Sequence, residues 1–193
     1  MTMSSSNDAT SNAVRLDVIG DAFVDLLCVM EPDAGMPEPG GDTRLASPVR
    51  TMAGGSALNT ATHLASLCQS IGGHRGHISL GLQAVWNEGD EHGKLLEAHA
   101  NRWGIRIKNC RTPEGAGATG HCIVIVSGNG ERSFLTHLGC VAHFCASHLD
   151  IHSLIRTNNL SVDAPTHSHH QHVHVAGYYN IPKFWNGNLQ SQL

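Results

Sequence analysis

The chain has 193 residues, of which 40% are hydrophobic and 15% are charged, a composition typical of a folded domain rather than of a disordered chain. The formal net charge of −4 and the absence of any run of lysine or arginine argue against a nucleic-acid partner. No apolar run reaches the roughly 20 residues that cross a bilayer, and the polar opening MTMSSSNDATSN lacks the apolar core of a signal peptide. We therefore expect a cytoplasmic protein without a membrane partner, whose six scattered cysteines are buried free thiols.

Strands and helices alternate along the first part of the chain, after a polar segment (1–13) that we expect to be a disordered tail. Apolar, β-prone runs predict strands at residues 15–20, 23–30, 77–85 and 105–110, with a short exposed strand at 43–51. Helical periodicity predicts one helix from residue 56 to the glycine pair at 72–73 and another from about 90 to 103. This order favours an α/β fold with a doubly wound, Rossmann-like sheet.

The segment that follows has a different pattern. The turn Gly128-Asn-Gly130 separates two β-rich runs, 120–127 and 132–138, and predicts a hairpin that forms a flap beside the main sheet. A helix at about 141–156 and a strand at 173–179 are expected next, and Pro182 is suited to open another helix. The alternation then stops in mid-cycle at Leu193, so we expect an incomplete domain over 14–193, with lid strands around 43–52 and 118–138.

Two polar features lie where a ligand would bind in such a fold. Asp25 closely follows the first predicted strand, and its carboxylate can accept two hydrogen bonds from hydroxyl groups. The alternative is that Asp25 is an ordinary solvated aspartate in a turn. Gly54 and Gly55 directly precede a helix whose first turn contains Asn59. Glycines let the backbone approach a ligand and the amide can both donate and accept, whereas the plainer interpretation is a turn with Ser56 as N-cap.

In this order and spacing, VIGDAFVDLL, GGDTRL, AGGSALNTATHLASL, GDEHGK and ATGHCIVIVSGNGERSFLTHLGC resemble the ribokinase-like (PfkB-type) family of sugar and nucleoside kinases. The resemblance runs over roughly residues 15–182 and implies a Rossmann-like core with a small β lid. It implies an ATP-dependent phosphotransferase, using Mg²⁺, that acts on a hydroxymethyl group of a sugar or nucleoside. It further implies that Asp25, Gly54, Gly55 and Asn59 hold the substrate, that Asn180 contacts the sugar, and that two chains pair through the lid as a homodimer.

The family's second signature, a DTxGAGD-like motif with the anion hole and the catalytic base, is not found in this sequence. The resemblance therefore implies a catalytic base after Leu193, and no residues for ATP or Mg²⁺ within this chain. The letters GAGATG at residues 115–120 fit a nucleotide-binding fingerprint, but they lead into a β-branched run rather than a helix. We expect this chain alone to be inactive; the alternative is an inactive sugar-binding or oligomerising module from a truncated kinase.

Histidine is abundant, with 15 residues, and the tract HSHHQHVH at 167–174 contains metal-binding side chains. We interpret the tract as an exposed loop with incidental affinity for Zn²⁺ or Ni²⁺. Cys145, His148 and His152 would share a face of the predicted helix 141–156, but structural zinc sites usually draw paired ligands from separate turns. We therefore predict no metal site.

Overall fold

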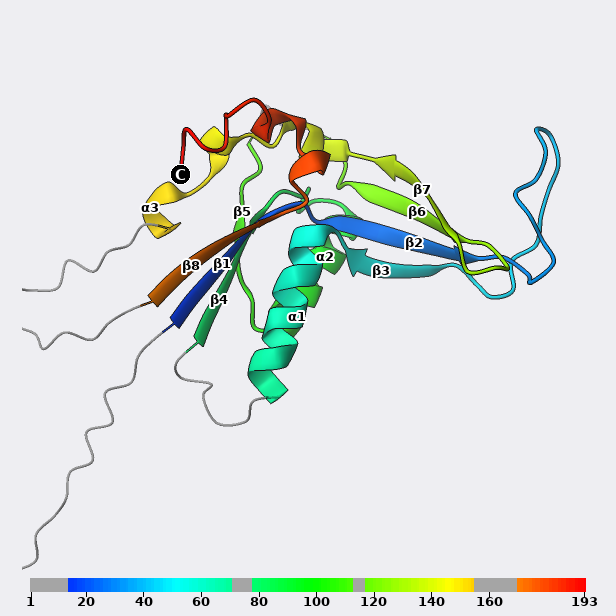
Figure 1. Ribbon diagram of the computed structural model, residues 1–193, viewed down its shortest axis with the longest axis horizontal. Helices are drawn as coiled ribbons and strands as arrows, with labels where there is room; N and C mark the ends of the chain where they lie inside the picture. Colours follow the sequence, from blue (N-terminus) through cyan, green and yellow to red (C-terminus); the bar gives the residue numbers. More distant parts are fainter. Residues whose placement is uncertain (1–13, 71–77, 113–116, 155–169) are drawn as a thin grey trace, which may run out of the picture.

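The computed structural model describes residues 14–70, 78–112, 117–154 and 170–193. The described residues form two four-stranded sheets in addition to their helices (Figure 1). One is a core sheet, and the other is a lid sheet that projects from it. The expected tail at 1–13 and the glycine pair at 72–73 lie outside the described residues.

The core sheet is parallel and has the strand order β5-β4-β1-β8. Its strands are β1 (Val14–Gly20), β4 (Ile78–Ala84), β5 (Arg106–Asn109) and β8 (His170–Ala176). Alternate residues of β1 face opposite sides: Val18 packs in one apolar cluster and Ile19 in the other, and both are fully buried. The sheet therefore has a hydrophobic layer on each face, as the sequence predicts for a doubly wound α/β fold.

Helices α1 (Ser56–Ser70) and α2 (Glu91–Arg102) cover one face of the core sheet (Figure 1). The apolar stripe of α1 recurs at helical spacing and buries Ala57, Leu58, Ala61 and Ala65 against the strands. Full burial of a side chain such as Leu58 stabilises a fold by about 1.5–3 kcal/mol.

Helix α2 begins at Glu91, directly after its N-cap Asp90, in agreement with the start at about residue 90 that the sequence predicts. The Asp90 carboxylate accepts hydrogen bonds from the Gly93 N–H at 2.7 Å and from the Thr119 N–H and hydroxyl, both at 2.7 Å. Partial burial would raise the pKa of Asp90, but the hydrogen bonds from Thr119 and Gly93 hold that pKa below its usual value. Asp90 thus joins the start of α2 to the segment that enters the lid.

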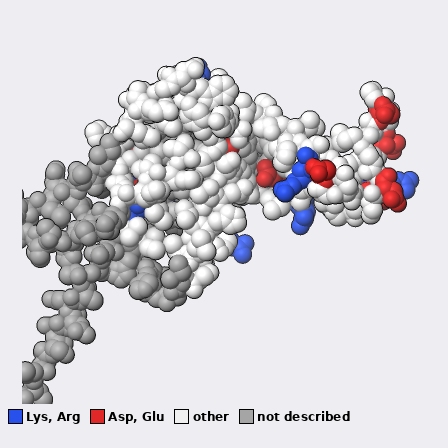
Figure 2. Space-filling model, in the orientation of Figure 1, with Lys and Arg blue, Asp and Glu red and all other residues white. Residues whose placement is uncertain are grey.

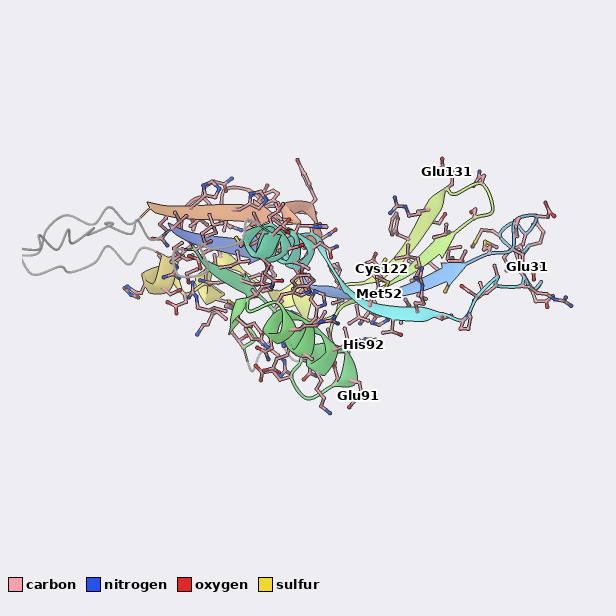
Figure 3. All side chains as sticks on the ribbon, turned by 90° about the horizontal axis from the view of Figure 1, so that it is seen from below. Glu31, Met52, Glu91, His92, Cys122 and Glu131 are labelled. Carbon is pink, nitrogen blue, oxygen red and sulfur yellow. The ribbon has the colours of Figure 1, made fainter. Side chains whose placement is uncertain are left out.

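The lid sheet has the order β3-β2-β6-β7, and only its β2–β6 pair is parallel. Its strands are β2 (Phe23–Val29), β3 (Arg50–Gly54), β6 (His121–Val126) and β7 (Arg132–His137). The predicted hairpin joins β6 to β7, and its turn is closed by hydrogen bonds from Ser127 N–H to Glu131 O (2.9 Å) and from Gly130 N–H to Ser127 O (2.8 Å). Figure 3 shows Glu31 and Glu131 at the end of the lid far from the core, and charged side chains gather over this part of the surface in Figure 2.

The predicted helix at 141–156 is wrong. The segment forms two 3₁₀ turns, Gly139–His143 and Ala146–His148, and a short helix α3 (Ile151–Leu154). Phe144, Cys145 and Leu149 have extended backbone angles between these turns. The extended residues let Val141, Phe144 and Leu149 all pack in the second apolar cluster, which is the one that contains Ile19. The segment is rich in His, Ser, Phe and Cys and has a weak helix propensity, so this packing determines its conformation.

Two strand boundaries also differ from the predictions. Within residues 43–51, the strand begins only at Arg50. Leu45 makes an isolated bridge with Met30, and Pro48 separates Leu45 from the strand. Strand β8 begins at His170 and ends at Ala176 rather than spanning 173–179, because it pairs with β1 along that strand's whole length. In the described part of the chain, no helix is long and apolar enough to cross a membrane.

All six cysteines are free thiols, as expected. Cys110, Cys122 and Cys140 are buried, whereas Cys28, Cys68 and Cys145 are partly exposed, which differs from the expectation that all are buried. Burial raises the pKa of the Cys110 thiol to about 12, so this residue is protonated and unreactive at neutral pH.

Candidate functional site

The chain order of the core sheet locates the candidate site. Strands β4 and β5 follow β1 on one side of the sheet, whereas β8 lies on the other side. In open α/β sheets, ligands bind beyond the carboxyl ends of the strands at such a switch point. Asp21 follows the end of β1, and Asn180 lies four residues beyond the end of β8.

A cleft of about 350 Å³ lies at this point, between the core and the lid. Its lining combines residues that follow β1 and β8, the start of α1, and one face of the lid: Asp21, Phe23, Asp25, Gly55, Ser56, Asn59, Cys122, Phe134, Thr136 and Asn180. Four of the five residues predicted as substrate-binding are in this set, and the fifth, Gly54, lies directly behind one of them.

Asp25 lies in β2, paired with Met52 of β3, and is half-buried. A side chain at Gly54 would collide with the Asp25 carboxylate, so the first glycine of the pair makes room for this acid. Burial, together with the charge of Asp21, raises the pKa of Asp25 above its ordinary value. The carboxylate is therefore held in a place where it lacks the full hydration that it would have at the surface.

The start of α1 supplies the next part of the cleft. Gly55 has a φ of +90°, a conformation that favours glycine, and a Cβ there would lie 2.8 Å from the backbone of Ala22. This tight passage brings Ser56 and the exposed Asn59 to the cleft wall. The glycine pair thus forms the turn into the helix and lies at the cleft, and its contact with a ligand stays a prediction.

The helix start is capped from a distance rather than by Ser56. The N–H of Ala57 donates to Asp21 Oδ1 at 3.1 Å, although the two residues are 36 positions apart. The same carboxylate accepts a hydrogen bond of 2.6 Å from Asn180 Nδ2, which belongs to the 3₁₀ turn Tyr178–Asn180. Asp21, Ala57 and Asn180 come from three separate segments and meet at one point.

Asp21 and the lid residues of the cleft are not among the residues that the sequence predicts as substrate-binding. Cys122 lies opposite Thr136 in the β6–β7 register, with their sulfur and hydroxyl oxygen 3.2 Å apart, and Phe134 lies two positions from Thr136 on the same face. Figure 3 shows Cys122 in the part of the lid that is close to the core. The two-residue alternation of the hairpin strands could have indicated these residues, but it does not tell which face meets the core.

The charge of the cleft restricts what it can hold. The described residues of its lining include two carboxylates and no lysine or arginine. Carboxylates accept hydrogen bonds, so this wall suits a neutral ligand rich in hydroxyl donors. The same wall does not fit a triphosphate, whose charge would be repelled by Asp21 and Asp25.

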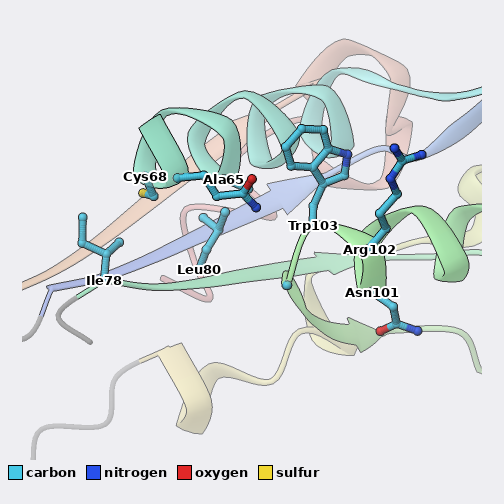
Figure 4. Close-up of a pocket in the computed structure, with 9 residues that line it drawn as sticks. Ala65, Cys68, Ile78, Leu80, Asn101, Arg102 and Trp103 are labelled. Carbon is cyan, nitrogen blue, oxygen red and sulfur yellow. The ribbon is translucent and has the colours of Figure 1, made fainter. Parts of the chain in front are cut away.

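A larger hollow of about 430 Å³ lies elsewhere, between the last turn of α1, the first residues of β4 and the end of α2 (Figure 4). Among the residues that the structure describes, its lining includes Cys68, Ile78 and Trp103 but no carboxylate. This hollow is at the amino ends of the strands, opposite the switch point, so we prefer the smaller cleft as the candidate site despite the difference in volume.

The part of the histidine tract that the structure describes is not the loop that we expected. His167 and His169 lie outside the described residues, but residues 170–174 belong to β8, where His172 and His174 are exposed and alternate with partly buried valines. Cys145 and His148 are adjacent, with Sγ and Nε2 3.0 Å apart, in a 3₁₀ turn rather than on the expected helix. Among the residues that the structure describes, no group of three or more His, Cys, Asp or Glu could hold a metal ion.

A parallel core sheet, a cleft at its switch point and a lid sheet over that cleft define an α/β protein of the Rossmann-like class. The profile of the family described as pfkB family carbohydrate kinase matches residues 15–177 of the chain. Because this match covers most of the sequence, the chain belongs to the pfkB carbohydrate kinase family, as the sequence motifs indicate. A comparison with curated proteins finds no match at a significant level.

Solved structures with the same fold include sugar and nucleoside kinases. A ribokinase from Thermotoga maritima is 18% identical, with a TM-score of 0.55 over 72% of this chain and 41% of its own. A Cryptococcus neoformans ribokinase in complex with ADP is 17% identical, with a TM-score of 0.51 over 86% of this chain and 41% of its own. An Anopheles gambiae adenosine kinase in complex with di(adenosine) tetraphosphate is 21% identical, with a TM-score of 0.51 over 69% and 43%. The chain thus spans less than half the length of these relatives.

Proposed function

We propose that this chain forms the acceptor-binding part and the lid of an ATP-dependent kinase that phosphorylates a hydroxymethyl group of a sugar or nucleoside. The observation that carries the proposal is that Asp25, Asn59 and Asn180, from three separate segments, line one cleft at the switch point of the sheet. Family membership supports the reaction class, and the cleft supports the assignment of this region to the acceptor.

In this proposal Asp25 accepts hydrogen bonds from acceptor hydroxyls, and Asn59 donates and accepts at the helix start. Gly54 and Gly55 act by leaving space, the first for the Asp25 carboxylate and the second for the turn into α1. The lid residues Cys122, Phe134 and Thr136 cover the acceptor from the other side.

The family implies ATP and Mg²⁺ as the phosphoryl donor and its ion, and phosphoryl transfer depends on electrostatic stabilisation of the transferred group. The described residues of this cleft do not fit that role, because their charged members are both carboxylates. The proposal for these residues is therefore limited to holding and orienting the acceptor.

The experiment that tests the acceptor site is a calorimetric titration of the whole chain with D-ribose, D-fructose and adenosine, each compared with its 5- or 6-phosphate ester. We expect at least one neutral compound to bind at least tenfold more tightly than its phosphate ester, because the acidic wall repels the ester. Equal binding of the ester, or no binding of any neutral compound, would contradict the proposal. Addition of ATP and Mg²⁺ is expected to give no phosphoryl transfer by this chain alone, since the described residues of the cleft do not fit a triphosphate.

We also propose that two chains pair through the lid. Strand β7 is at the edge of the lid sheet, and all six of its residues are exposed, including Leu135 at 56%. An exposed edge with apolar side chains is a template for pairing with another strand. We expect sedimentation velocity to give a dimer, and Leu135→Lys to shift it towards the monomer, while Lys183→Ala on the core leaves it unchanged. A monomeric wild-type chain would disprove this pairing.

A further inference from the structure

Asp21 is a fully buried carboxylate in the wall of the cleft. Its exposed fraction is 0%, whereas Asp25 is only half-buried. Burying an ionised carboxylate is costly unless it is well hydrogen-bonded, so such a residue needs a reason to be there. Its two oxygens each have a partner, Ala57 N–H at 3.1 Å and Asn180 Nδ2 at 2.6 Å.

The bond to Asn180 determines how that side chain can face a ligand. A carboxylate only accepts hydrogen bonds, so Asn180 must turn its NH₂ group towards Asp21. The carbonyl oxygen Oδ1 is then the polar atom of Asn180 that is left for the cleft, which Asn180 helps to line. Without Asp21 the amide would be equally able to present its donor side.

The bond to Ala57 fixes the helix that carries Asn59. The first N–H groups of a helix have no partner within the helix, and a carboxylate there also interacts favourably with the helix dipole. The backbone carbonyl of Asp21 is a further contact, accepting from Leu58 N–H at 3.4 Å. One residue thus ties the start of α1 to the turn after β8.

The backbone around Asp21 leaves space for this carboxylate. Gly177 has a φ of +70°, and a side chain at this position would collide with both Asp21 carboxylate oxygens. The turn after β8 therefore contains a glycine where it passes the acid, and Asn180 follows three residues later.

We propose that Asp21 is the positioning residue of the acceptor cleft: it orients the Asn180 amide so that its carbonyl faces the acceptor, and it anchors the helix start that carries Asn59. The part that concerns the acceptor rests on the proposed function, whereas the orientation of Asn180 does not. In this arrangement Asp25, Asn180 Oδ1 and Asn59 all offer acceptors, which selects a ligand that donates through its hydroxyl groups.

The charge of Asp21 also affects Asp25, and this separates positioning from a purely structural role. Burial and the Asp21 charge are the two causes that raise the pKa of Asp25. Asp21→Asn removes the charge but retains the size, so it should lower the titration midpoint of Asp25. A residue that merely filled space would leave that midpoint unchanged.

The test follows three nuclear magnetic resonance signals of the labelled chain without any ligand. In the wild type we expect the Asn180 side-chain NH₂ to exchange with solvent at least tenfold more slowly than that of Asn186, because both residues are exposed but the Asn180 NH₂ donates to Asp21. Asp21→Asn retains only one acceptor oxygen, so we expect at least one of the Asn180 protection and the hydrogen-bonded shift of the Ala57 amide to be lost, and the Asp25 midpoint to move to lower pH. Asp21→Ser, which is smaller and also uncharged, should give the same kind of change and serves if the first variant does not fold.

Equal exchange of Asn180 and Asn186 in the wild type would overturn the proposal without any variant. An unchanged Asp25 midpoint in a folded variant would also overturn it. A separate titration with D-ribose, D-fructose and adenosine should then give roughly threefold to tenfold weaker binding in the folded variant, as expected for one misplaced hydrogen bond. If the wild type binds none of these compounds, the proposed function fails while the three ligand-free signals still decide the role of Asp21.

Discussion

Asp25→Ala is expected to weaken binding of the sugar or nucleoside by about 100-fold, because hydrogen bonds to a charged group contribute about 1.5–3 kcal/mol. Asp25 lines the cleft with its carboxylate half-buried, so it can form such bonds with less competition from water than a surface acid. Calorimetric titration of the variant with the compound that binds best to the wild type measures the change. Asp33→Ala is the matched control, since this acid is exposed in the lid loop and lies outside the cleft.

The pH dependence gives a second readout for the same residue. Because burial and Asp21 raise the pKa of Asp25, binding that needs its carboxylate should be lost as pH falls through this raised value. The effect on stability has the opposite sign. The folded state holds the Asp25 proton more tightly than the unfolded state, so this group's contribution to the free energy of unfolding decreases as pH rises between the two pKa values.

Asp25→Asn should therefore increase the free energy of unfolding at neutral pH while it weakens ligand binding. Chemical denaturation at neutral and acidic pH compares the two proteins, and the gain should disappear where Asp25 is protonated in both states. If the variant binds the ligand as tightly as the wild type does, Asp25 is not part of the binding site.

Phe184→Ala is expected to lower the free energy of unfolding by about 3–5 kcal/mol, because it leaves a cavity in the second apolar cluster. Phe184 is fully buried, and its ring centroid lies 4.9 Å from that of Phe144. Ile181 and Leu189 are also buried in this cluster, so the C-terminal turns belong to the folded core. Urea unfolding followed by circular dichroism measures the loss.

Tyr179→Ala is the control for this prediction, since Tyr179 is 85% exposed and lies in the same segment. Its replacement should change the free energy of unfolding by less than about 0.5 kcal/mol. Similar stabilities of the two variants would mean that the C-terminal segment does not pack on the sheet as described.

Local patterns were sufficient for several elements of this protein. The glycine pair, the helix periodicity after it and the Asp90 cap predict α1 and α2, and the Asn-Gly turn predicts the β6–β7 hairpin. Each of these signals depends on neighbouring residues, whose conformational preferences act before any tertiary contact forms. Asp25 and Asn59 could be proposed as site residues because a strand and a helix start carry them and because the motifs around them resemble those of the family.

The remaining features depend on contacts between distant segments. Residues 141–154 form turns instead of one helix because Phe144 and Leu149 are drawn into a cluster that also contains Phe184. Asp21 follows a strand in the sequence like any turn aspartate, and only the folded chain brings Ala57 and Asn180 to its two oxygens. Local sequence could propose the acid, the amide and the glycines of the cleft. Their meeting at one point required the strand order of the sheet, because β1 and β8 are far apart in the sequence and are neighbours only in the folded sheet.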